Sequence, residues 1–167
     1  MITLEQFDKN DFERLINWVD TEEMLVQFGG PLFSFPLTIE QLKAYKNDKN
    51  RHLFKVIESG ENAIGHAELF QPEDEKTIRI CRVLIGDKTK RGQGIGQQII
   101  NELLNISFVN LEKENVELNV YDWNTRAIKC YEKVGFAVNP NKTFESEMNG
   151  DVWTAINMTI EKDGWKL

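Results

Sequence analysis

Residues 91–96 read Arg-Gly-Gln-Gly-Ile-Gly, and they lie between an apolar stretch, Ile78 to Ile85, and an amphipathic run that begins at Ile95. This order predicts a strand, a glycine-rich turn and a helix. Such a turn leaves backbone N–H groups unpaired at a helix N-terminus, where the helix dipole also favours an anion. Glycine lets a bulky group approach the backbone, and Arg91 would add a charged fork. The segment predicts a phosphate-binding loop; the alternative is a glycine-rich turn with a solvated arginine.

Two commoner phosphate loops do not fit this segment. A Walker loop ends in Gly-Lys-Ser/Thr, whereas Gly96 is followed by Gln97 and Gln98. A dinucleotide fingerprint requires G-x-G-x-x-G, and counting from Gly92 through Gly94 places Gln97 where the third glycine belongs. An NTPase loop and a nicotinamide-binding loop are therefore both disfavoured.

A second block of residues lies further along the chain. Residues 124–136 read Asn-Thr-Arg-Ala-Ile-Lys-Cys-Tyr-Glu-Lys-Val-Gly-Phe. Together with Arg91-x-x-Gly94-x-Gly96, this block resembles the GNAT superfamily of N-acetyltransferases, whose second signature is N-x-x-A-x-x-x-Y-x-x-x-G-F. The resemblance covers residues 77–136 firmly; the first half of the chain resembles the ribosomal-protein-type subgroup only loosely. It implies acetyl-CoA as the cosubstrate, with its pyrophosphate held by Arg91, Gly92, Gln93, Gly94, Ile95 and Gly96.

The resemblance also assigns roles to four further residues. Tyr131 would contact the cofactor sulfur and protonate the departing thiolate, because a phenol with a pKa near 10 is protonated at neutral pH. An isolated helical Tyr is otherwise usually a core residue. Asn124 would contact the pantetheine arm, cap the following helix, or do both. The amides of Val83 and Ile85 would bond to pantetheine in a gap between two splayed parallel strands, or make ordinary ladder pairs.

The base that deprotonates the acceptor amine is harder to assign. Many members of the family place a carboxylate on the strand before the glycine loop, but residues 79–83 read Arg-Ile-Cys-Arg-Val and contain none. We select Glu68, on the neighbouring predicted strand, as the substitute, and His66 would lie on the same strand face. The alternative is a surface ion pair between Glu68 and Arg79 or Arg82 across the hairpin.

In this family the first helices and their loop normally hold the acceptor. Aromatic and acidic side chains gather in that part of the sequence, with one aromatic opposite them: Trp18, Glu22, Glu23, Phe28, Phe33, Phe35 and Trp153. Such a set suits a cation, although most of the aromatics would serve equally well as core. We expect the acceptor to be a small-molecule amine, such as a polyamine or an aminoglycoside, or a protein N-terminus.

The composition sets wider limits. A chain of 167 residues is expected to form one domain over residues 1–167. Its net charge of −7 argues against a nucleic-acid-binding surface. The apolar runs are far shorter than the roughly 20 residues of a membrane helix, and no secretion-signal pattern opens the chain. Cys81 and Cys130 lack metal-ligand spacing, so we expect reduced thiols, no metal, and a cytoplasmic protein without membrane partners.

Apolar periodicity predicts the order of the elements. We expect a strand at 2–7, three short helices up to Tyr45, strands at 52–58, 62–70 and 77–85, a helix from Ile95 to about Val109, a strand at 116–121, a helix at 125–134, and the last strands through Ile160. The strand–turn–helix–strand order requires a right-handed crossover and a parallel pair. The expected fold is therefore α/β (α+β), GNAT-like, with a mixed, mostly antiparallel central sheet, a splayed parallel strand pair and helices on both faces.

Two alternatives stay open at this level. A non-catalytic acyl-CoA sensor or interaction module on the same fold competes with the enzyme, because the usual strand carboxylate is missing. The last strand, at 152–160, would either extend the sheet across a homodimer or be covered within one chain.

Overall fold

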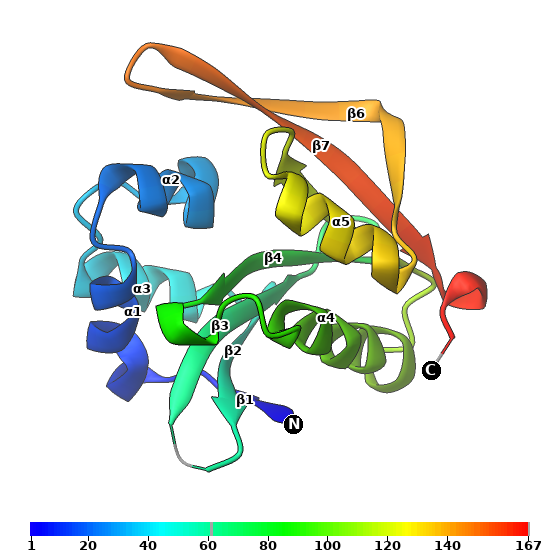
Figure 1. The fold of residues 1–167 in the computed structure, drawn as a ribbon, viewed down its shortest axis with the longest axis horizontal. Coiled ribbons are helices and arrows are strands. Elements are labelled where there is room, and N and C mark those ends of the chain that lie inside the picture. The colour runs from blue at the N-terminus through cyan, green and yellow to red at the C-terminus, as the bar shows by residue number, and fades with distance from the viewer. Residues whose placement is uncertain (61, 167) are drawn as a thin grey trace.

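The computed structural model describes residues 1–60 and 62–166 and contains a seven-stranded sheet in the order β1-β2-β3-β4-β5-β7-β6 (Figure 1). Only the β4–β5 pair is parallel; the other neighbours are antiparallel. The predicted mixed, mostly antiparallel sheet is confirmed. Its strands are β1 (Ile2–Gln6), β2 (Arg51–Glu58), β3 (Ala63–Phe70), β4 (Thr77–Ile85), β5 (Asn115–Tyr121), β6 (Ala137–Met148) and β7 (Asp151–Glu161).

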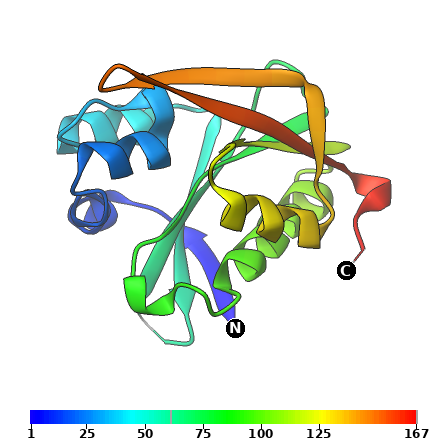
Figure 2. The same cartoon turned by 45° about the horizontal axis from the view of Figure 1, so that its top comes forward.

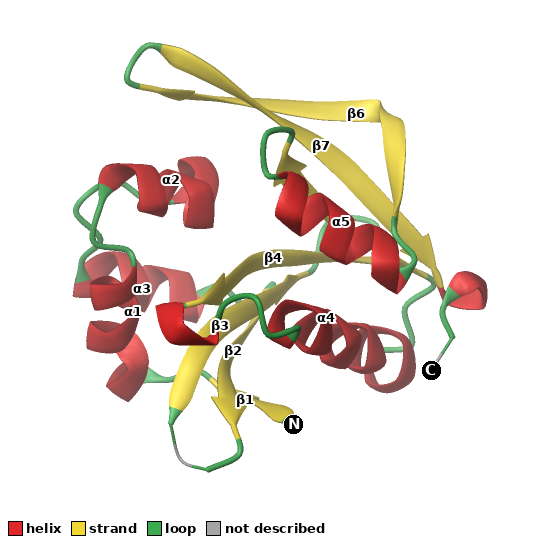
Figure 3. Cartoon of the chain, viewed as in Figure 1, coloured by secondary structure: helices red, strands yellow, loops and turns green. Residues whose placement is uncertain are grey.

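Helices cover both faces of this sheet, as predicted (Figures 2 and 3). One face carries α1 (Phe12–Trp18), α2 (Glu22–Gly29) and α3 (Ile39–Asn47), which bury an apolar cluster that includes Leu15, Leu25 and Leu42. The other face carries α4 (Ile95–Asn105) and α5 (Thr125–Val134), over a larger cluster that includes Ile99 and Leu103. None of the helices in the described ranges is long and apolar enough to span a bilayer.

Local sequence signals explain where the helices begin and end. The side chains of Thr21 and Thr38 accept hydrogen bonds from the backbone of the first turns of α2 and α3. The Thr38 hydroxyl accepts from the backbone N–H of Gln41, while the Gln41 side chain bonds to the loop around Ser34. The helix expected to reach Val109 ends as α4 at Asn105 and continues as a π-helical turn over Ile106–Asn110.

The parallel pair is short, and this shapes the site. Only Thr77–Ile80 of β4 pairs with Asn115–Leu118 of β5. Beyond these residues β4 runs on to Ile85 and β5 to Tyr121 without pairing to each other, so the predicted splay is confirmed. The register of β3 and β4 also shifts opposite this region, where Arg82 has a φ of +49°. A bulge of this kind increases local twist and turns β4 away from its parallel neighbour.

The last strand is covered on both sides. Strand β7 pairs with β5 along one edge and with β6 along the other. Of the two alternatives for the last strand, coverage within one chain is therefore what the structure shows, and the free edges of the sheet belong to β1 and β6. The β6–β7 hairpin extends past the sheet toward α2 in both views (Figures 1 and 2).

Candidate functional site

The glycine-rich loop forms the turn that its sequence predicts. Gly92 and Gly94 have φ values of +86° and +78°, a region that glycine enters without strain. Gly94 is the N-cap of α4 and offers no side-chain acceptor to the first turn. The amides of Ile95 and Gly96 therefore lack intrahelical partners and point out of the helix end, which is the arrangement that binds phosphate oxygens.

Side chains brace this loop on both sides. The Nε of Arg91 donates to the carbonyl of Ile85 over 3.0 Å, and the Nε2 of Gln93 donates to the carbonyl of Thr89 over 2.9 Å. The terminal nitrogens of the exposed Arg91 side chain stay available for an anion. The side chain of Ile95 is buried, so this residue would offer only its amide.

The splayed strands lie next to the loop. Val83 and Ile85 are in the part of β4 that has no parallel partner, and their side chains pack against the apolar cluster under α4 and α5. Their backbone position fits the strand-like pairing expected for a pantetheine arm. On the other edge of β4, Ile85 pairs with Gly65 of the antiparallel strand β3.

Asn124 and Tyr131 come from the turn before α5 and from α5 itself. The Oδ1 of Asn124 accepts from the backbone N–H of Ala127 over 3.3 Å, so the predicted cap is confirmed. Tyr131 is half-buried and packs near Phe136, and within residues 1–60 and 62–166 its hydroxyl has no hydrogen-bond partner. Burial raises the pKa of Tyr131 above its ordinary value, which keeps the phenol protonated.

The loop and α5 meet directly. A Cβ placed on Gly96 would lie 3.7 Å from the Sγ of Cys130, the residue before Tyr131. The Cys130 thiol is a poor nucleophile here, because burial raises its pKa. Burial likewise raises the pKa of the Cys81 thiol, to about 12, and both cysteines are free thiols.

Glu68 is in a different setting from the one that we expected of a base. It is completely buried, its Oε1 accepts from Arg51 over 2.5 Å, and its Oε2 accepts from Arg82 over 2.7 Å and from the Tyr45 hydroxyl over 2.5 Å. The alternative of an ion pair with Arg82 is thus present, in the interior rather than on the surface. A carboxylate that is completely buried and held by three protein donors is not exposed to an acceptor amine.

Arg79, the other alternative partner, binds elsewhere. It donates to Glu117 of β5 through Nε over 2.9 Å and through Nη2 over 2.6 Å. Glu117 also accepts from Lys142 over 3.2 Å. Burial acts to raise the pKa of Glu117, but the bonds and charges of Arg79 and Lys142 outweigh it and lower this pKa below its ordinary value.

His66 shares the strand face with Glu68, as predicted, and its Nε2 lies 3.1 Å from the Tyr45 hydroxyl. Because that hydroxyl donates to Glu68, Nε2 carries the proton and Nδ1 is a buried acceptor without a partner among the described residues. Burial and the charge of Arg82 lower the pKa of His66 to about 3. An imidazole of that pKa is a weak proton acceptor for an ammonium group.

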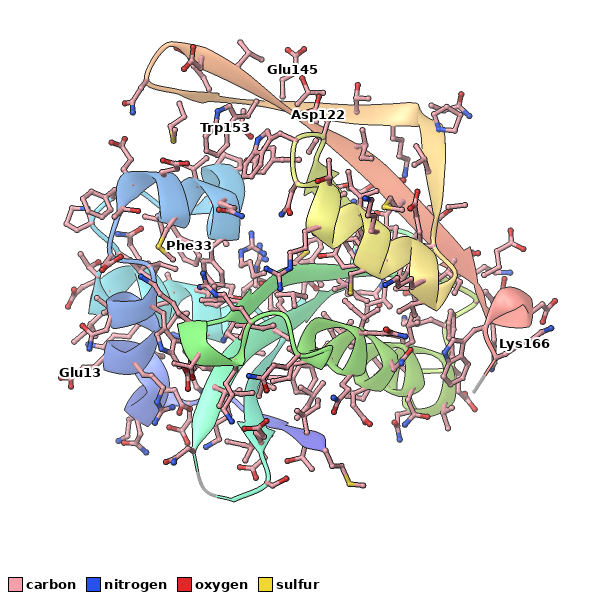
Figure 4. The ribbon with its side chains drawn as sticks, viewed as in Figure 1. Glu13, Phe33, Asp122, Glu145, Trp153 and Lys166 are labelled. Atoms are coloured by element: carbon pink, nitrogen blue, oxygen red, sulfur yellow. The ribbon has the colours of Figure 1, made fainter. Side chains whose placement is uncertain are left out.

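Most aromatics proposed for the acceptor side are core. Phe28 is buried, Phe33 stacks near it, and Trp18 packs so closely on Gly86 that a Cβ there would lie 2.0 Å from its ring. Glu22, Glu23 and Phe35 are exposed. Trp153 lies between the hairpin and α2 (Figure 4).

Trp153 belongs to an aromatic cluster that the sequence did not indicate. It packs edge-to-face on Tyr121 and Trp123, with ring centroids 5.2 and 5.3 Å away. The Tyr121 hydroxyl lies 3.5 Å from the carbonyl of Val26, so the end of β5 contacts α2. The sequence Tyr-Asp-Trp at a predicted strand end was the available signal. In the network around Glu68, Arg82 was expected as an alternative partner, but Tyr45 and Arg51 had no sequence signal, because their contacts join distant elements.

Comparison with known proteins agrees with this geometry. A protein-family comparison matches residues 13–136 to the acetyltransferase (GNAT) family. An N-acetyltransferase 9-like protein of Caenorhabditis elegans is 25% identical over 134 residues, covering 71% of this chain and 66% of the relative. The spermidine N(1)-acetyltransferase of Vibrio cholerae is 25% identical over 150 residues, covering 89% of this chain and 86% of the relative.

A solved structure gives the same result at the level of the fold. The spermidine N-acetyltransferase from Vibrio cholerae, in complex with CoA and spermine, superposes with a TM-score of 0.82 at 22% identity and covers 98% of this chain and 96% of its own. The ribosomal-protein-type likeness of the first half stays a prediction.

Proposed function

The chain belongs to the acetyltransferase (GNAT) family of enzymes, and on that premise we propose that it transfers an acetyl group from acetyl-CoA to a primary amine by direct attack in a ternary complex. The observation that carries this proposal is that three features meet at one place: free amides at the start of α4, the splay of β4 from β5, and the protonated Tyr131 of α5. We also propose that residues 1–167 act as one domain.

Each part of the cofactor would bind to a different one of these features. Arg91, Gly92, Gln93, Gly94, Ile95 and Gly96 would hold its pyrophosphate. The backbone of Val83 and Ile85, with the Asn124 side chain, would hold the pantetheine arm. This arrangement brings the thioester to the widening between β4 and β5, beneath α5. A metal has no part in the proposed reaction.

Tyr131 would act as the acid of the reaction. The nitrogen lone pair of the neutral amine attacks the thioester carbonyl, the carbon–sulfur bond breaks, and the leaving thiolate takes the phenolic proton. The proton lost by the new amide then returns to the phenolate through solvent. Since burial raises the pKa of Tyr131, the acid form persists throughout the physiological pH range.

Glu68 would not serve as the base in this scheme. Accepting a proton would break its ion pairs with Arg51 and Arg82 inside the protein. We propose instead that Glu68 is a positioning residue that fixes Arg82 on the bulge of β4. The acceptor would then bind in its neutral form or lose its proton to water.

We propose a small-molecule amine as the acceptor. Relatives named for spermidine and aminoglycoside acetylation support this class. The Tyr121, Trp123 and Trp153 cluster beside α2 offers aromatic surface to a cation, and the acidic net charge of −7 would favour its approach. A protein N-terminus is the alternative acceptor.

The test is CoA release, followed as free thiol, against a panel of polyamines, aminoglycosides and simple amines. Tyr131→Phe should lower kcat by roughly a hundredfold or more, the usual contribution of a general acid, and leave acetyl-CoA affinity unchanged. Cys130→Ala is the matched control beside it and should retain activity. Full activity in Tyr131→Phe would exclude the acid role.

One observation favours a second function, because no free carboxylate lies where Glu68 was expected to act. A non-catalytic acyl-CoA sensor on the same fold would bind acetyl-CoA tightly and release no CoA with any amine of the panel.

A further inference from the structure

Arg126 stands beside the glycine loop although it belongs to α5. A Cβ placed on Gly92 would lie 2.9 Å from the Nη2 of Arg126. The guanidinium of one sequence block therefore lies directly against the backbone of the other block, 34 residues earlier in the chain. The side chain of Arg126 is exposed, and within the described ranges it makes no ion pair or hydrogen bond.

Arg126 belongs to a group of positive charges in an acidic protein. The protein has 27 acidic and 20 basic residues, yet the loop region and α5 are rich in cations: Lys88, Lys90, Arg91, Arg126, Lys129 and Lys133. Lys90 is already paired with Glu58. Arg91 donates from its Nε to the carbonyl of Ile85, and the rest of its guanidinium has no partner among residues 1–60 and 62–166. Two arginines with unused donors thus stand at the loop, one from each block.

We propose that Arg126 binds the pyrophosphate of the cofactor, so that Arg91 of the glycine loop and Arg126 of α5 both bind it. This inference rests on the proposed function. A guanidinium is a planar fork that pairs with two phosphate oxygens at once. The loop amides would hold the pyrophosphate from the side of α4, and the guanidinium of Arg126 would hold it from the side of α5.

The same geometry gives Gly92 a second role. Its φ of +86° already favours glycine, and any side chain would in addition enter the space of the Arg126 guanidinium. Gly94, at +78°, has open space around the same position. The absence of a side chain at Gly92 therefore lets Arg126 reach the anion.

The experiment measures the Kd of CoA by calorimetry for the wild type, Arg126→Gln and Lys129→Gln. Lys129 is also exposed and lies one turn further along α5, so both variants remove one positive charge from the same helix. Arg126→Gln should weaken CoA binding roughly tenfold or more, the effect of losing a charged hydrogen-bond partner. Lys129→Gln should change it by less than about twofold. Equal weakening in both variants would overturn the contact.

Two ligand analogues locate the phosphate. Arg126→Gln should also weaken the binding of 3′-dephospho-CoA, which retains the pyrophosphate. The same variant should leave the KM of acetyl-pantetheine, which has no phosphate, unchanged. A loss that vanishes with 3′-dephospho-CoA would overturn the pyrophosphate assignment. If the wild type binds no CoA, the proposed function itself fails; if Arg126→Gln binds CoA as tightly as the wild type, only this inference fails.

Discussion

A buried polar network lies within the apolar cluster between the sheet and α1, α2 and α3. Glu68 joins two arginines and a tyrosine from three other elements, and Arg82 holds its place on a bulge at positive φ. An L-residue in that region is strained, and such strain persists only where surrounding contacts fix it. The ion pair with Glu68 supplies such a contact. We therefore regard Glu68 as part of the support of β4 and not as the proton acceptor that its position in the sequence suggested.

His66 gives a prediction about pH. Its folded-state pKa of about 3 lies below the ordinary value of 6.5, so the unfolded chain binds a proton first as the pH falls. Stability from this group is complete above pH 6.5 and is lost as the pH decreases toward 3. Between pH 6.5 and 5, His66 should contribute a slope approaching about 1.4 kcal/mol per pH unit to the free energy of unfolding.

Urea unfolding across that range checks the contribution of His66. His66→Gln should flatten the pH dependence, whereas His52→Gln, which removes the chain's other and exposed histidine, should leave it as in the wild type. If the free energy of unfolding of His66→Gln had the same pH dependence as that of the wild type, His66 would have the same pKa in the folded and unfolded states.

At the scale of elements, the paired part of β4 and β5 holds the two strands together, and their unpaired ends form the proposed cofactor site. Arg79 and Glu117 are directly opposite each other in the four-residue ladder of β4 and β5. Their ion pair holds the two strands together immediately before they diverge. The strand ends beyond it have no mutual hydrogen bonds, so the ladder and this ion pair must maintain the distance between them.

Removal of this ion pair should be costly. Glu117→Ala leaves the guanidinium of Arg79 without its carboxylate partner and should lower the free energy of unfolding by about 3 kcal/mol or more. The matched control is Glu114→Ala, which removes the ion pair between Lys76 and Glu114, the residues just before β4 and β5. The side chain of Lys76 is 67% exposed and that of Glu114 is 59% exposed. That change should cost less than about 1 kcal/mol. Similar losses in both variants, measured by urea unfolding, would contradict this distinction.

The sequence predicted the elements of the second half better than the contacts of the first. Thr125–Val134 and the loop at Gly92 and Gly94 follow from local signals: an N-cap, a terminal glycine and a helical period. The network around Glu68 does not, because it depends on which strands become neighbours. The predicted hairpin offered Arg82 as a partner of Glu68, but no short spacing indicates the contacts of Arg51 and Tyr45, which lie 17 and 23 residues from Glu68. The alternation of β3 placed His66 and Glu68 on one face but did not indicate that Tyr45 contacts both of them.

At the scale of the whole molecule, charge is unevenly distributed. The net charge is −7, while Lys88, Lys90, Arg91 and Arg126 lie in or beside the loop proposed for the anionic cofactor. Exposed acids occur on the acceptor side, with Glu22 and Glu23 in the first turn of α2. The anionic acetyl-CoA and a cationic amine would therefore bind at different parts of the surface, each with charge opposite to its own.

This distribution predicts how salt affects the reaction. Attraction between the acidic molecule and a polyamine acts over distances comparable to the Debye length, about 30 Å at 10 mM salt and about 10 Å at 100 mM. Raising the salt concentration from 10 to 100 mM should therefore increase the KM of a polyamine severalfold and change the KM of a singly charged amine much less. Steady-state kinetics on a matched pair of alkyl amines, one with a single amino group and one with three, makes the comparison. Equal changes in both KM values would show that contacts at the aromatic cluster of Tyr121, Trp123 and Trp153, and not the field of the whole protein, select the acceptor.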